Sequence, residues 1–256
     1  MVLRCTYWIP HGDELIDLPD KESRIMRQKI SEATALDRSP VRVVISPHGI
    51  GLTKNIGIIM TEHLHGTYRI KKGLITARYS NDRKLAEIIV NSFPEFTEKV
   101  TFASSSGPVS VFPVDFGTII PLKFFKRGDI VMIGQPRINR KEVLVRFGRQ
   151  LFKSVSEYEK EVSVIFSADM AHTHTKDGPY GFSEDAAKYD EIVQGYFKNQ
   201  TFSEAMDITD AMIVNAKPDS YWNLLILSGF LAESGERMKF ENYYVEQHFG
   251  MLFAHT

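Results

Sequence analysis

The chain has 256 residues, of which 43% are hydrophobic, so it is long and apolar enough to bury a substantial core. Its 31 Lys and Arg residues nearly balance its 32 Asp and Glu residues, so no basic excess points to nucleic acid as a partner. The single cysteine, Cys5, excludes an intramolecular disulfide and a thiolate metal cluster.

The chain begins with two predicted strands that each lead into a histidine turn. Residues 3–9 form the first predicted strand, and Pro10-His11-Gly12 follows it. Residues 21–36 are rich in charge and in good helix formers, which predicts a helix. The β-branched residues 41–45 predict a buried strand that runs into the turn Ser46-Pro47-His48-Gly49.

Helices and strands continue to alternate to the end of the chain. We predict helices over residues 82–93, 140–155, 183–197 and 220–233, and strands over residues 129–133, 162–166, 240–245 and 249–253. This order predicts an α/β sandwich with a central mainly parallel or mixed sheet and helices on both faces. No Pro-, Gly- or Ser-rich linker parts the sequence, so we expect a single domain over residues 1–256.

The two Pro-His-Gly turns are the strongest candidates for a metal site. His11 and His48 each follow a predicted strand, and ligands of such folds sit beyond the carboxyl ends of the strands. Two imidazoles and one carboxylate make the facial triad of non-haem iron(II) enzymes. The alternative is that each histidine merely caps its strand, but two histidines in the same context favour a ligand pair.

Further histidines follow other predicted elements. His172 lies just beyond the predicted strand 162–166, where an imidazole can move protons near neutral pH. His172 and His174 are also a possible second metal pair, which we favour less because no carboxylate of the segment completes it. His63 and His65 alternate in the sequence, and a solvated strand face is the better interpretation.

Four segments together resemble one family. They are PHG at residues 10–12, ISPHG at 45–49, FSADMAHTHTKDGPYGFSEDAAKYDEIV at 166–193 and YVEQHFGMLFA at 244–254. In this order and spacing they resemble the class III extradiol ring-cleavage dioxygenases, a family that includes Memo-like relatives. The resemblance implies the family's α/β fold and a metal-dependent site for an aromatic substrate.

The resemblance also implies a role for individual residues. His11, His48 and Glu246 match the family's iron ligands, and His172 matches its acid/base histidine. From the sequence pattern alone Glu241 is an equally good carboxylate, and the family ending is what selects Glu246. The implied cofactor is Fe²⁺, with Zn²⁺ as the alternative.

The implied activity is extradiol cleavage of a catechol-type ring by dioxygen, as in aromatic compound catabolism. One alternative is a Memo-like, non-catalytic metal-binding or interaction protein, and another is a zinc-dependent hydrolase on the same ligands. Retention of two histidines and a carboxylate favours an enzyme, because a scaffold does not need to bury such groups.

The sequence departs from the family at one position. The family often carries Asp-His-Gly in mid-chain, where this chain has VDFG, so Phe116 replaces a histidine that lines the site. We expect Phe116 to border the cavity near the metal, and the alternative is that it packs into the core. His174 or His248 are candidates to compensate for the missing imidazole, and Tyr180 is a candidate pocket residue.

Compartment and partners follow from weaker signals. The N-terminal apolar stretch is broken by Pro10, His11 and Asp13, so it does not resemble a signal peptide. One cysteine is consistent with a reducing compartment, and we expect a cytoplasmic protein. The longest apolar runs are too short to span a bilayer, so no membrane contact is expected. We expect a homo-oligomer whose ligands are a small aromatic substrate and dioxygen.

Overall fold

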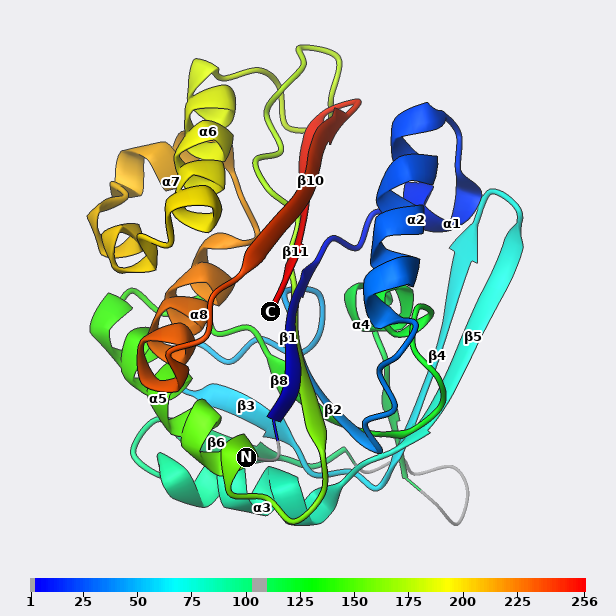
Figure 1. The fold of residues 1–256 in the computed structure, drawn as a ribbon, viewed down its shortest axis with the longest axis vertical. Helices are drawn as coiled ribbons and strands as arrows, with labels where there is room; N and C mark the ends of the chain where they lie inside the picture. Colours follow the sequence, from blue (N-terminus) through cyan, green and yellow to red (C-terminus); the bar gives the residue numbers. More distant parts are fainter. Residues whose placement is uncertain (1–2, 103–109) are drawn as a thin grey trace.

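The computed structural model describes residues 3–102 and 110–256, and an eight-stranded mixed sheet runs through its centre (Figure 1). The strand order is β10-β11-β1-β9-β2-β8-β3-β6. The strands of this sheet are β1 (Leu3–Ile9), β2 (Val41–Ser46), β3 (Ile56–Ile59), β6 (Thr97–Val100), β8 (Asp129–Gly134), β9 (Val162–Ser167), β10 (Lys239–Glu246) and β11 (Phe249–His255). The central strands β1, β9, β2 and β8 are mutually parallel, and β11 and β3 flank them in the antiparallel sense.

Helices cover both faces of this sheet, as the sequence predicted. The longer helices are α2 (Lys21–Thr34), α3 (Arg83–Ser92), α5 (Lys141–Ser156), α6 (Glu184–Asn199) and α8 (Tyr221–Ser234). The shorter ones are α1 (Glu14–Asp17), α4 (Phe116–Leu122), the 3-10 helix η1 (Phe202–Asp207) and α7 (Asp210–Ala216). Side chains alternate across β2: Val43 packs into the core with α3, α5, α6 and α8, and Val44 into the core with α2 and α4.

The apolar helix α8 lies close against α5. A Cβ atom at Gly229 would lie 1.8 Å from the carbonyl oxygen of Val145, and one at Gly148 would lie 1.9 Å from that of Ile226. Glycine at both positions therefore lets the two backbones touch. Asn223 of α8 donates to the carbonyl oxygens of Ile45 and Ser167, which fixes the start of α8 over the ends of β2 and β9.

The predicted helices and strands are all present, with ends shifted by a few residues at most. A small second sheet in the order β5-β4-β7 was not predicted; its strands are β4 (His63–Ile70), β5 (Gly73–Ser80) and β7 (Val111–Pro113). His63 and His65 lie on β4, the first exposed and the second half-buried, in agreement with a solvated strand face. No helix among the described residues is long and apolar enough to cross a membrane.

Candidate metal centre

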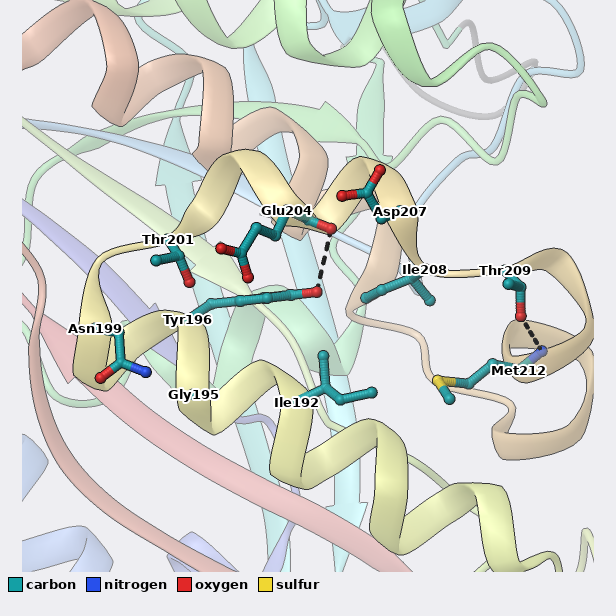
Figure 2. A pocket seen from close by; sticks show the side chains of 10 residues that line it. All are labelled: Ile192, Gly195, Tyr196, Asn199, Thr201, Glu204, Asp207, Ile208, Thr209 and Met212. Atoms are coloured by element: carbon teal, nitrogen blue, oxygen red, sulfur yellow. Dashed lines mark hydrogen bonds between the residues drawn. The ribbon is translucent and has the colours of Figure 1, made fainter.

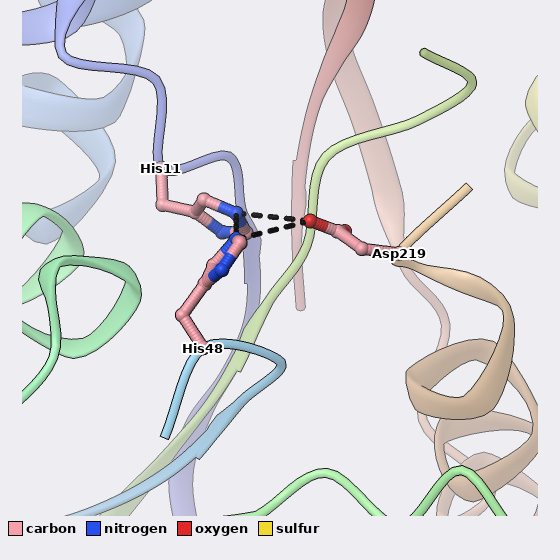
Figure 3. Close-up of side chains that lie close together, drawn as sticks. All are labelled: His11, His48 and Asp219. Atoms are coloured by element: carbon pink, nitrogen blue, oxygen red, sulfur yellow. Dashed lines mark hydrogen bonds and ion pairs between the residues drawn. The ribbon is translucent and has the colours of Figure 1, made fainter. Parts of the chain in front are cut away.

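His11 and His48 come together because their strands end at the same edge of the sheet. β1 and β2 both pair in parallel with β9, and each histidine stands two residues beyond its strand. The Nε2 atoms of the two rings are 2.9 Å apart (Figure 3). His11 is buried, whereas the side chain of His48 is 30% exposed. The pair therefore has one solvent-accessible side.

The carboxylate beside these imidazoles belongs to Asp219. Its Oδ2 atom lies 3.1 Å from Nε2 of His11 and 3.4 Å from Nε2 of His48, as Figure 3 shows. Asp219 immediately precedes Ser220, the N-cap residue of α8. Its other oxygen, Oδ1, accepts a hydrogen bond of 2.9 Å from the backbone N–H of Asp169. The amide of Gln135 donates to the Asp219 carbonyl oxygen at 2.6 Å. The first bond orients the carboxylate, and the second holds the main chain that carries it.

The hydrogen bonds of His11 select the tautomer that a metal needs. Its Nδ1 atom lies 2.9 Å from the hydroxyl oxygen of Ser167. That hydroxyl has one proton, and it donates it to the carbonyl oxygen of Gly117 at 2.5 Å. Ser167 must therefore accept from His11, so the ring proton of a neutral His11 is on Nδ1 and the lone pair of Nε2 is free for a metal.

The three ligand atoms have the spacing of one metal's coordination sphere. Bonds of about 2.1 Å at right angles put neighbouring ligands roughly 3 Å apart. The edges of the His11, His48 and Asp219 triangle are 2.9, 3.1 and 3.4 Å. Two histidines and one carboxylate therefore fit the facial triad expected for iron(II), and the same donors suit zinc.

Three ionisable side chains, those of His11, Asp169 and Asp219, are buried together at this centre. Burial lowers the pKa of His11, but the negative charges of Asp169 and Asp219 outweigh it and raise the pKa to about 9. Burial also acts to raise the pKa of Asp219, but the charge of His11 and hydrogen bonds from both imidazoles hold it well below its usual range. Burial raises the pKa of Asp169, which lies 3.4 Å from Nε2 of His11. Of the two carboxylates, Asp219 is therefore the one whose ionised form the surroundings favour.

His172 stands on the wall next to this triangle. Its side chain, with those of Asp169 and Asp219, forms a second group whose ligand atoms lie within 4.8 Å of one another. The Nδ1 atom of His172 is 3.1 Å from the carbonyl oxygen of Lys217, which can only accept. The proton of the neutral ring is therefore on Nδ1, and Nε2 is free to accept another.

A cleft of about 420 Å³ opens from the centre. It is lined by His48, Arg137, His172, Tyr180, Ile213, Val214, Lys217, Pro218, Asp219 and Trp222. The guanidinium of Arg137 lies 5.2 Å from the ring centre of Trp222, and the ammonium of Lys217 lies 5.7 Å from that of Tyr180. The walls thus combine aromatic faces with two cations.

Phe116 packs directly on the histidine pair. Its ring centre lies 4.1 Å from that of His48, 5.7 Å from that of His11 and 5.0 Å from that of Tyr68. Phe116 does not line the cleft itself. The residue therefore packs on the imidazoles but is not one of the side chains that line the cleft.

The carboxylates that the sequence and the family resemblance offered are not part of this triangle. Within the described part of the chain, the groups with metal-ligand spacing contain Asp219 and Asp169 but not Glu246. Glu246 is the last residue of the edge strand β10 and is buried beside Asp20. Burial, and then the Asp20 carboxyl, raise the pKa of Glu246 to about 7. Glu241 pairs with Lys29 at 3.2 Å and with Lys239.

The remaining candidate histidines have structural partners or lie farther out. Nε2 of His174 is 2.8 Å from Oδ2 of Asp190, which also accepts from the hydroxyl of Tyr243 at 2.6 Å. His174 is not among the cleft residues, and the ring of His248 is centred 6.4 Å from that of His172. The sequence does contain a signal for Asp219: Pro218-Asp219-Ser220 puts an acid at the start of an apolar helix.

A second cavity, of about 440 Å³, lies between α6, η1 and α7 (Figure 2). It is lined by Ile192, Gly195, Tyr196, Asn199, Thr201, Glu204, Asp207, Ile208, Thr209 and Met212. It contains no histidine, and the hydroxyl of Tyr196 is bonded to the carbonyl oxygen of Glu204. The histidines and carboxylates that could bind a metal or transfer a proton are therefore at the cleft of about 420 Å³.

Known proteins resemble the chain over nearly its whole length. Residues 6–254 match the family model for the catalytic LigB subunit of aromatic ring-opening dioxygenase. Protein CA_C1420 of Clostridium acetobutylicum is 26% identical over 275 residues; the match covers 99% of this chain and 57% of that protein, so the chain spans little more than half of its relative. The crystal structure of the uncharacterized protein JW3007 from Escherichia coli K12 covers 98% of both chains at 15% identity with a TM-score of 0.65, which shows a common fold.

Proposed function

The chain belongs to the family of the catalytic LigB subunit of aromatic ring-opening dioxygenases, and on that premise we propose that it opens a catechol-type ring in the extradiol position with non-haem iron(II). The proposed metal ligands are His11, His48 and Asp219. The observation that supports this most is the triangle of their ligand atoms, with edges of 2.9 to 3.4 Å, beside a cleft of about 420 Å³ that His48 and Asp219 line. Asp219 thus takes the role that the resemblance gave to Glu246.

The residues around the cleft have separate roles in the proposed reaction. A bound iron(II) ion would supply a Lewis acid for the two catechol oxygens and a partner for dioxygen. His172 accepts the proton of a catechol hydroxyl on Nε2, because the Lys217 carbonyl holds its other proton on Nδ1. Ser167 holds His11 in the ligating tautomer. The aromatic ring of Phe116 shields from water the parts of the two imidazoles that it contacts.

The cleft walls fit a flat aromatic substrate. The aromatic rings of Trp222 and Tyr180 line the cleft. The guanidinium of Arg137 lies close to the Trp222 ring, and the ammonium of Lys217 lies close to the Tyr180 ring. Pockets of this size and composition hold small organic ligands with a few polar contacts that set their orientation. We propose that the ring lies between these walls with its hydroxyls toward Asp219 and His172.

Anaerobic loading with iron(II), followed by a panel of catechols and dioxygen, tests the proposal. We expect one dioxygen consumed for each yellow ring-opened product formed, and no turnover in the zinc-loaded protein. Asp219→Asn should lose bound iron, whereas Glu246→Gln should keep it. Loss of iron only in Glu246→Gln would overturn the ligand assignment. Iron binding without oxygen uptake on any catechol would favour the non-catalytic alternative.

A further inference from the structure

Five cations surround a small cavity at the opposite end of β2 from the metal centre. The cavity has a volume of about 230 Å³. The basic side chains that line it are Arg42 of β2, Arg78 of β5, and Lys123, Lys126 and Arg127 of the segment before β8. Arg42 is the second residue of β2, and His48 stands beyond the other end of that strand. This cavity is therefore separate from the site described above.

Arg42 is the unusual member of this group. Its side chain is 2% exposed, and its Nε and Nη2 atoms have no hydrogen-bond partner. The Asp37 carboxylate is 3.7 Å from Nη2, but its oxygens already accept bonds from Tyr7, Ser39 and Ser163. A buried guanidinium with free donors is costly unless an anion meets it.

Unlike Arg42, which faces Asp37, the other four cations have no acidic partner in the described part of the chain. Among the described residues, none of Arg78, Lys123, Lys126 and Arg127 forms an ion pair with a carboxylate. Each is exposed at the rim, and exposure alone would explain a solvated lysine or arginine. It does not explain the convergence of all four on the one recess that holds a buried arginine.

Two aromatic residues complete the walls. The ring of Phe125 lies under the Arg42 guanidinium, with 4.8 Å from Cζ to the ring centre, and orients its plane. Tyr79 lines the same cavity. Burial raises the pKa of the Tyr79 phenol, and the charges of Arg42 and Arg127 oppose that rise. Both cations are therefore close enough to the Tyr79 hydroxyl to interact with it electrostatically.

We propose that this cavity binds the phosphate group of a small molecule, with Arg42 at its base and Lys126 and Arg127 at its rim. Arginine forks bind phosphate oxygens in pairs, and several cations match a dianion better than a single carboxylate. The volume is below the 300 to 1,000 Å³ that is typical of pockets for whole drug-sized ligands, so the cavity suits one anionic group. A nucleic acid would need an extended basic surface, and the chain as a whole carries a net charge of −1.

Calorimetric titration with inorganic phosphate and with glycerol phosphate at low ionic strength tests the proposal. The full chain should bind both probes, and Lys126→Gln/Arg127→Gln should bind them at least 10-fold more weakly. The matched control Lys54→Gln/Arg149→Gln removes two exposed cations outside the cavity and should bind like the wild type. Arg42→Lys, which keeps the charge but not the fork, should also bind more weakly; circular dichroism establishes that each variant is folded.

Three outcomes would overturn the proposal. In the first outcome, the wild type shows no binding heat with either probe. In the second, the control variant Lys54→Gln/Arg149→Gln loses as much phosphate affinity as Lys126→Gln/Arg127→Gln. In the third outcome a single-stranded oligonucleotide would bind through Lys126 and Arg127 while both small phosphates fail, which would assign the surface to nucleic acid. If Arg42→Lys does not fold, the rim variants still decide the result.

Discussion

The Ser167 hydroxyl offers the sharpest test of how this chain prepares a metal ligand. Ser167→Ala removes the acceptor for Nδ1 of His11, 2.9 Å away, and the donor to the Gly117 carbonyl, 2.5 Å away. Groups that orient a metal-bound histidine in this way are typically worth about 10- to 100-fold in metal affinity, or about 1.4 to 2.7 kcal/mol. Each buried polar group left unpaired costs about 1–3 kcal/mol of folding free energy.

A matched control separates these two effects. Ser163 lies on the same strand, β9, is equally buried, and bonds Ser39 and Asp37 at the end of the strand away from the metal centre. Both alanine variants should unfold at lower denaturant concentration. Only Ser167→Ala should lose metal affinity, measured by competition with a chromophoric chelator for zinc or cobalt. Equal metal affinity in the wild type and in Ser167→Ala would refute the tautomer argument.

Three further predictions concern single side chains, two of them near the metal centre and one on the edge strand of the sheet. His172→Ala should lower single-turnover ring opening by about 10²- to 10⁴-fold while metal content by elemental analysis stays nearly constant; loss of metal would make His172 a ligand. Phe116→His should change the catechol preference or the rate, measured as kcat/KM across the panel, with little change in Tm; unchanged activity with a marked fall in Tm would make Phe116 a packing residue only. Burial and the Asp20 carboxyl raise the pKa of Glu246 to about 7, so its contribution to the free energy of unfolding is complete below its ordinary pKa of 4.5 and is lost as the pH rises through about 7. The free energy of unfolding of Glu246→Gln, measured by denaturant titration, should lack this decline. Parallel pH profiles of the free energy of unfolding for the two proteins would contradict this prediction.

The amino-acid sequence determined most of the framework by itself. Apolar runs such as those of β2 and β9 can be buried on both faces only in the middle of a sheet, so their position followed from composition. His11 and His48 each follow a parallel strand, and parallel strands end at one edge, so their meeting was predictable. The small second sheet was not predictable, because β4 and β5 carry many polar residues and β5 is largely exposed, which is also typical of loops.

Only the tertiary structure decided which carboxylate joins the histidines. Glu246 and Asp219 are far apart in sequence from both histidines, and no local periodicity relates them to the end of β1 or β2. Packing of α8 against β2 and β9, through Asn223, carries Asp219 to the strand ends, whereas pairing of β10 with β11 leaves Glu246 at the sheet edge beside Asp20. Metal-ligand sets form across distant segments, so helix packing, rather than spacing along the chain, brings Asp219 to the histidines.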